Sequence, residues 1–120
     1  MKMPFNSIFS WIIKKRIHQI DLFKKYPFDV QTEVLNQLVE HSKDTEFGKA
    51  NQLAKTKNYS DFKKNVPLSD YASLKPYVDR MLNNEQNLVW GSEISWFAKS
   101  SGSTSGKSKF LPVSKEALED

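Results

Sequence analysis

The chain has 120 residues, enough for one domain at most, and its apolar content lies above the level typical of disordered chains. The net charge of +4 favours acidic partners, but lysines and arginines are scattered over predicted helices, so nucleic-acid binding is not expected. There is no cysteine, which excludes disulfides and thiolate metal sites, and His18 and His41 lack metal-ligand spacing.

Residues 1–93 are expected to be mainly helical. In residues 7–25 apolar side chains recur at three- and four-residue spacing, as in an amphipathic helix, and Pro27 is expected to end it. Asp29 is the predicted N-cap of a second helix. The apolar run 8–13 is too short to span a bilayer and precedes its cations, the reverse of a secretory signal, so we expect a cytoplasmic protein without membrane binding.

Further along the chain, Ser60 and Ser69 can each begin a short helix, and Pro76 is expected to interrupt the second and open another. Residues 94–98 and 110–113 are rich in aromatic and β-branched side chains, which predicts two short strands. Residues 94–113 therefore form a strand, a loop and a strand, and residues 114–120 begin a helix. Because that helix is so short, we expect the chain to be part of a longer one.

The loop between the predicted strands, residues 100–109, has the sequence SSGSTSGKSK. Glycines allow successive backbone N–H groups to turn toward one point, hydroxyls add donors, and lysines add charge, so this composition suits a polyphosphate. A flexible linker is the alternative interpretation, but a linker joins separable units, whereas only about ten residues separate these strands.

A Walker-type P-loop is a second alternative, because Gly102, Gly106, Lys107 and Ser108 approximate its pattern. The spacer between the glycines holds three residues instead of four. The residues after Lys109 are also predicted to be extended, whereas a Walker loop leads into a helix.

Several segments together resemble the auxin-responsive-promoter family of acyl-acid amido synthetases, which belongs to the adenylate-forming superfamily. They extend from about residue 17 to the chain end and are TEFGK (45–49), YSDFK (59–63), VPLSDY (66–71), LKPYVDR (74–80), Trp96-Phe97 and Ser100-Ser101-Gly102. The general superfamily loop has six steps from its first glycine to its lysine, whereas Gly102 to Lys109 is seven, as in the amido synthetase branch.

The resemblance implies an α/β fold in which an N-terminal helical segment and a β-hairpin-like unit form part of the large N-terminal domain of an adenylate-forming enzyme. It implies that ATP, with Mg²⁺, activates a carboxylic acid and that an amine such as an amino acid then displaces AMP. The rest of a full-length enzyme would supply the other sites. No residue is assigned as catalytic or as a metal ligand. The expected phosphate-binding residues are Ser100, Ser101, Gly102, Ser103, Thr104, Ser105, Gly106 and Lys109.

Two other functions remain open from the residues alone. The N-terminal helices could form an interaction or membrane-surface module with the loop as a linker. Alternatively, a nucleotide could bind at a P-loop without any carboxylic acid, which a helix after Lys109 would favour.

Overall fold

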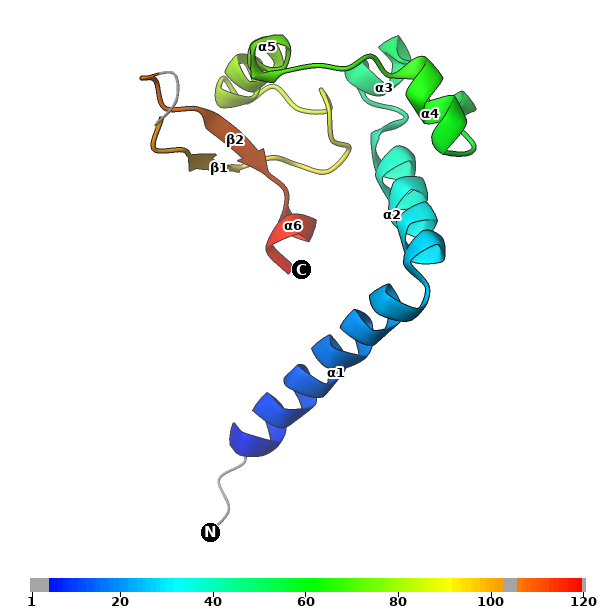
Figure 1. Ribbon diagram of the computed structural model, residues 1–120. Coiled ribbons are helices and arrows are strands. Elements are labelled where there is room, and N and C mark those ends of the chain that lie inside the picture. The colour runs from blue at the N-terminus through cyan, green and yellow to red at the C-terminus, as the bar shows by residue number, and fades with distance from the viewer. Residues whose placement is uncertain (1–4, 103–105, 120) are drawn as a thin grey trace. The chain divides into compact units, whose positions relative to one another are not determined.

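The computed structural model describes residues 5–102 and 106–119, and side chains from residue 10 onward. The chain divides into two compact units, residues 1–35 and 36–120, which are considered separately. Helix α1 (Phe5–Lys25) and the beginning of α2 (Pro27–Ser42) lie in the first unit (Figure 1). The described elements of the second are mostly helical, with one two-stranded antiparallel sheet.

The break between α1 and α2 falls at Tyr26, because a residue before proline is disfavoured in the helical conformation. Pro27 is then the first residue of α2, a position where its missing N–H leaves no bond unmade. The prediction that Asp29 caps this helix was therefore wrong. Asp29 lies within the first turn, where its negative charge favours the positive end of the helix dipole.

Helix α1 exposes much of its apolar surface. The exposed large side chains along it are Trp11, Ile12, Ile13, Ile17, Ile20, Leu22 and Phe23. Within the part of the chain that the structure describes, no helix combines the length and the apolar character needed to cross a membrane. The predicted amphipathic helix is confirmed in position, and these described apolar side chains are partly or largely exposed.

Four helical segments lie between α2 and the strands. They are α3 (Glu46–Ala50), the 3-10 turn η1 (Leu53–Lys55), α4 (Tyr59–Asn65) and α5 (Tyr71–Leu82). Asn58 caps α4 through a bond from the Asp61 N–H at 2.9 Å. Asp70 caps α5 in the same way, through a bond from the Ser73 N–H at 3.0 Å.

The predicted helix starts at Ser60 and Ser69 were therefore wrong by one or two residues. Each true cap is a neighbouring Asn or Asp whose side-chain oxygen reaches the third residue beyond it. Pro76 does not interrupt α5, although an internal proline costs a helix about 3 kcal/mol. Burial of Val78 and Met81 just beyond it offsets that cost.

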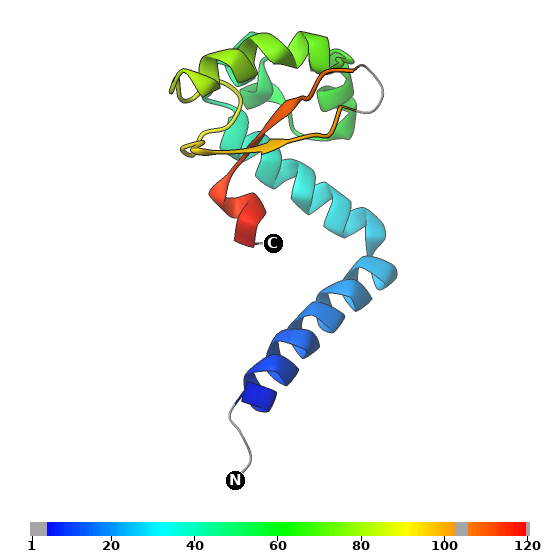
Figure 2. The ribbon, with the colours of Figure 1, turned by 90° about the vertical axis from the view of Figure 1, so that its left-hand side faces the viewer.

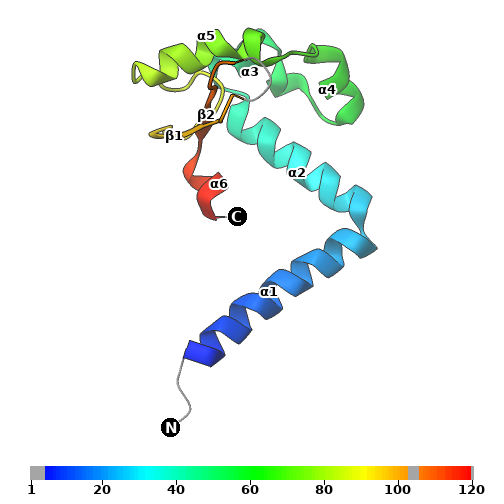
Figure 3. The ribbon, with the colours of Figure 1, turned by 60° about the vertical axis from the view of Figure 1, so that its left-hand side comes forward.

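Helices α3 and α5 lie near each other (Figure 3), and side-chain contacts join them. The buried Thr45 hydroxyl caps α3 by accepting the Gly48 N–H at 3.0 Å. Arg80 pairs with Glu46 through two hydrogen bonds of 2.7 and 2.8 Å, and the Phe47 ring meets Tyr77 edge to face at 6.2 Å. Two sequence segments that lie about thirty residues apart, TEFGK and LKPYVDR, thus form one structural unit.

The two predicted strands are confirmed as β1 (Trp96–Lys99) and β2 (Phe110–Val113), which pair antiparallel with Lys99 opposite Phe110. Helix α5 lies alongside β2, and the loop end of the hairpin is near the beginning of α5 (Figure 2). Helix α6 (Lys115–Glu119) follows, and the predicted cap at Ser114 is confirmed by a bond from the Ala117 N–H at 3.2 Å.

A small core holds these elements together. Its buried side chains, Met81, Leu88 and Ile94, come from α5 and from the segment before β1. Helix α6 is attached to the segment before β1 through Glu116. Its carboxylate accepts hydrogen bonds from Ser92 Oγ at 2.5 Å and from Trp90 Nε1 at 3.2 Å. The Trp90 ring stacks on His41 at 5.0 Å. Residues on both sides of the hairpin are thereby linked.

The Glu116 carboxylate should make this link dependent on pH. The pKa of this carboxyl is lowered from 4.5 to about 2. The largest cause is the hydrogen bond from the Ser92 hydroxyl, followed by those from the Glu116 backbone N–H and the Trp90 indole. A depressed folded-state pKa stabilises the fold above pH 4.5, and the contribution is lost as the pH falls toward about 2. Glu116→Gln should therefore lower the Tm of the protein at pH 7, and the Tm difference from wild type should narrow toward pH 3.

The matched control is Glu119→Gln on the same helix, whose exposed carboxylate lies 3.8 Å from Lys115. Exposed ion pairs contribute little, so this variant should melt close to wild type at each pH. If the Tm of Glu116→Gln differs from that of wild type by the same amount from pH 7 to pH 3, the carboxylate charge is not the stabilising feature.

Candidate functional site

The loop between β1 and β2 is closed at its neck by two hydrogen bonds. The Ser100 N–H donates to the Lys109 carbonyl at 2.8 Å, and the Lys109 N–H donates to Ser100 Oγ at 3.0 Å. The Ser100 hydroxyl oxygen thus accepts the Lys109 N–H in place of the Ser100 carbonyl, which would accept it in a regular antiparallel ladder. Since this oxygen still carries its own proton, the Ser100 hydroxyl remains able to donate to an anion.

Two glycines allow the loop to turn. Gly102 has a φ of +73° and Gly106 a φ of +68°, a left-handed region that other residues adopt at a cost. A Cβ on Gly102 would also lie 2.8 Å from the Lys107 carbonyl carbon and 2.9 Å from its oxygen, whereas one on Gly106 would meet nothing within 4 Å. The backbone on the two sides of the loop therefore approaches closely at Gly102.

The structure brings part of the expected phosphate-binding set together. Ser100 and Lys109 pair at the neck, and Ser101, Gly102 and Gly106 lie in non-helical backbone beyond it. Ser103, Thr104 and Ser105 fall outside the described residues. Phe110–Val113 is a strand, so the helix that a Walker loop needs directly after its lysine is not formed, which argues against the P-loop alternative.

The Lys109 side chain is placed by a residue for which the sequence predicted no role. Its ammonium nitrogen lies 5.2 Å from the centre of the Tyr71 ring, within the range of a cation–π interaction. The Tyr71 hydroxyl bonds to the backbone of Phe110, the residue after Lys109. Tyr71 lies in the VPLSDY segment, and its place beside the loop connects that segment to SSGSTSGKSK.

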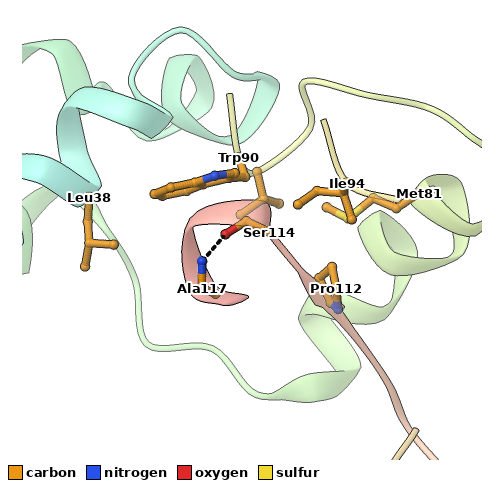
Figure 4. A pocket seen from close by; sticks show the side chains of 8 residues that line it. Leu38, Met81, Trp90, Ile94, Pro112, Ser114 and Ala117 are labelled. Atoms are coloured by element: carbon orange, nitrogen blue, oxygen red, sulfur yellow. Dashed lines mark hydrogen bonds between the residues drawn. The ribbon is translucent and has the colours of Figure 1, made fainter. Parts of the chain in front are cut away.

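A separate pocket of about 240 Å³ lies at the other end of β2 (Figure 4). Its lining is Leu38, Met81, Val89, Trp90, Ile94, Pro112, Ser114 and Ala117. These side chains offer no charge, and the Ser114 hydroxyl already accepts the Ala117 N–H. A triphosphate needs charged and N–H partners, so the loop and not this pocket is the candidate phosphate site.

Magnesium ions require oxygen ligands, chiefly carboxylates, phosphates and water. Residues 100–109 contain no Asp or Glu, and within the described ranges no group of three His, Asp or Glu side chains is placed to hold a metal. Among the described residues, therefore, no preformed cluster of metal-binding side chains stands beside the loop.

The turn between the two strands combines glycines, hydroxyls and a lysine at its end, a composition whose N–H groups and charge can bind an anion. In comparison with known proteins, a family model described as "GH3 family N-terminal domain" matches residues 16–120. The chain belongs to the GH3 family, and the resemblance to acyl-acid amido synthetases is thereby confirmed.

Plant members of the family are similar to much of this chain. A jasmonoyl-L-amino acid synthetase, JAR4 of Nicotiana attenuata, is 27% identical over 120 residues, which cover 99% of this chain and 21% of that protein. Two indole-3-acetic acid-amido synthetases of Arabidopsis thaliana follow. GH3.2 is 30% identical over 106 residues (88% of this chain, 19% of that protein), and GH3.17 is 32% identical over 92 (75% and 15%). The chain thus spans 15–21% of the length of these relatives.

Proposed function

We propose that this chain is the N-terminal segment of an adenylate-forming ligase that joins a carboxylic acid to an amine. In the first step a carboxylate oxygen forms a bond to the α-phosphorus of ATP, and the bond to the β-phosphate side breaks, releasing pyrophosphate. In the second step the amine nitrogen attacks the acyl carbon, AMP leaves with the bridging oxygen, and the nitrogen loses a proton. Membership in the GH3 family together with the neck-closed loop supports this proposal.

In this proposal the loop holds the phosphate chain of ATP while the carboxylate attacks. The phosphates carry concentrated negative charge, so fixed N–H groups, hydroxyls and the Lys109 ammonium lower the energy of the transition state more than mobile water could. Ser100, Ser101, Gly102, Gly106 and Lys109 are the described members of this set, and Ser103, Thr104 and Ser105 complete it. Carboxylate attack needs no general base, because the nucleophile is already charged.

The names of the relatives suggest the substrate class. They conjugate amino acids to indole-3-acetic acid or to jasmonate, two small carboxylic acids. We propose that the present enzyme likewise takes a small carboxylic acid and an amino acid. Magnesium would be coordinated chiefly by the phosphate oxygens, where it would neutralise part of their charge. Dependence on ATP favours the cytoplasm.

The proposal predicts that the full-length enzyme releases pyrophosphate from ATP only when a suitable carboxylic acid is present. The 120-residue chain alone should give no turnover above the background without enzyme, because it spans only about a fifth of its relatives. The measurement is a pyrophosphate-release assay with a panel of carboxylic acids. Clear acid-dependent release by the 120-residue chain would show that the remaining segments are dispensable, and none from the full-length enzyme with any acid would contradict the proposed reaction.

A further inference from the structure

Tyr71 bonds to both backbone groups of one strand residue. Its hydroxyl donates to the Phe110 carbonyl at 2.9 Å and accepts from the Phe110 N–H at 3.1 Å, across 39 residues of sequence. It is the first residue of α5, and the Asp70 cap directly before it fixes the beginning of that helix. The hydroxyl is thus held by a defined helix end.

These bonds fall at the open edge of the hairpin. Ser100 and Lys109 bond to each other across the two strands, and in an antiparallel ladder such pairs alternate with pairs whose polar groups face outward. Phe110, opposite Lys99, belongs to an outward-facing pair. An unpaired strand edge leaves its N–H and C=O groups to water or to another chain. The Tyr71 hydroxyl satisfies both groups and fixes β2 directly after the loop.

The Tyr71 ring contacts the side chain of Lys109, the residue directly before Phe110. The Lys109 ammonium lies 5.2 Å from the ring centre, so the side chain that would meet the phosphates rests against an aromatic face. An ammonium group has three N–H donors, and those directed away from the ring remain available to phosphate oxygens. One side chain therefore restrains the backbone at Phe110 and the charged group at Lys109.

We infer that Tyr71 is a positioning residue for ATP: it fixes the end of the phosphate loop and the Lys109 ammonium before the nucleotide binds. This inference rests on the proposed function. Groups that are already ordered lose less entropy on binding, so Tyr71 should act on nucleotide affinity and not on affinity for the acid.

Two substitutions in the full-length enzyme separate the two contacts. Tyr71→Phe removes only the hydroxyl and should raise KM for ATP by about three- to tenfold in acid-dependent ATP–pyrophosphate exchange. Tyr71→Leu also removes the ring and should raise it by about a further two- to fivefold. In both variants KM for the acid should stay within about twofold of wild type, since only the nucleotide contacts the loop in this proposal.

Tyr59→Phe is the matched control. Tyr59 is likewise the first residue of a helix and follows an Asn cap, but its side chain lies 68% exposed on α4. This variant should leave both KM values unchanged. Hydrogen exchange at the Phe110 amide gives a second readout: Tyr71→Phe should accelerate it, whereas Tyr59→Phe should not.

The outcomes distinguish this inference from the proposed function. No acid-dependent exchange by the unsubstituted enzyme would overturn both. Exchange by that enzyme, with KM for ATP unchanged in Tyr71→Phe and Tyr71→Leu, would overturn the role of Tyr71 alone. Equal rises in KM for ATP and for the acid would also overturn it, because they would show general damage to the fold.

Discussion

Replacing Lys109 with alanine in the full-length enzyme is expected to lower kcat/KM for ATP by about 10- to 150-fold. The range follows from the loss of one hydrogen bond to a charged group, worth about 1.5–3 kcal/mol. The Lys109 ammonium lies 5.2 Å from the centre of the Tyr71 ring, next to the two hydrogen bonds that close the loop. The measurement is steady-state pyrophosphate release at varied ATP with the acid saturating.

Lys107→Ala is the matched control for this prediction. Lys107 lies in the same loop and is exposed, but it is not among the expected phosphate-binding residues. It should change kcat/KM for ATP by less than about threefold, the effect of a distant screened charge. Equal losses in the two variants would mean that the loop acts through its total charge, and an unchanged Lys109→Ala would remove this lysine from the site.

Gly102→Ala is expected to have an effect of similar size, through the backbone. An alanine at a φ of +73° is disfavoured by about 1–2 kcal/mol. Its Cβ would also lie 2.8 Å from the Lys107 carbonyl carbon, which is backbone and cannot move aside as a side chain does. The loop should open, and ATP-dependent activity should fall by more than about tenfold.

Gly106→Ala separates the effect of the left-handed backbone conformation from the effect of the overlap between the Cβ and the Lys107 backbone. Gly106 has a similar φ of +68°, but a Cβ there meets nothing within 4 Å. It carries the left-handed penalty without the backbone overlap, so its loss of activity should be the smaller of the two. Both variants are compared by kcat/KM for ATP after their Tm values are shown to match wild type within a few degrees. A larger loss in Gly106→Ala than in Gly102→Ala would contradict the closeness of the loop at Gly102.

The hairpin could be predicted from sequence because its signals are local. Aromatic and β-branched runs flank a segment of hydroxyls and glycines, and the strands begin or end within two residues of the expected positions. The helix boundaries were harder, because several candidate caps stand close together and only backbone geometry decides among them. Asn58 and Asp70 cap their helices, although Ser60 and Ser69 were equally plausible from composition.

Tyr71 could not be found in the same way. Its contact with Phe110 joins residues 39 positions apart, and no periodicity or spacing rule relates a helix end to a strand edge at that distance. The pair of Glu46 and Arg80 has the same character, since it links α3 to α5 across 34 residues. The family resemblance included the segments of Glu46 and Arg80, TEFGK and LKPYVDR, but gave no physical reason why these residues occur there. The contacts supply that reason.

The central claim is that the strand-flanked loop holds the phosphate chain of ATP. A crystal structure of the full-length enzyme with a non-hydrolysable ATP analogue tests it most directly. The claim predicts phosphate oxygens within hydrogen-bond distance of backbone N–H groups of residues 101–106 and of Lys109 Nζ. Phosphates bound elsewhere, with the loop N–H groups directed away from them, would contradict it.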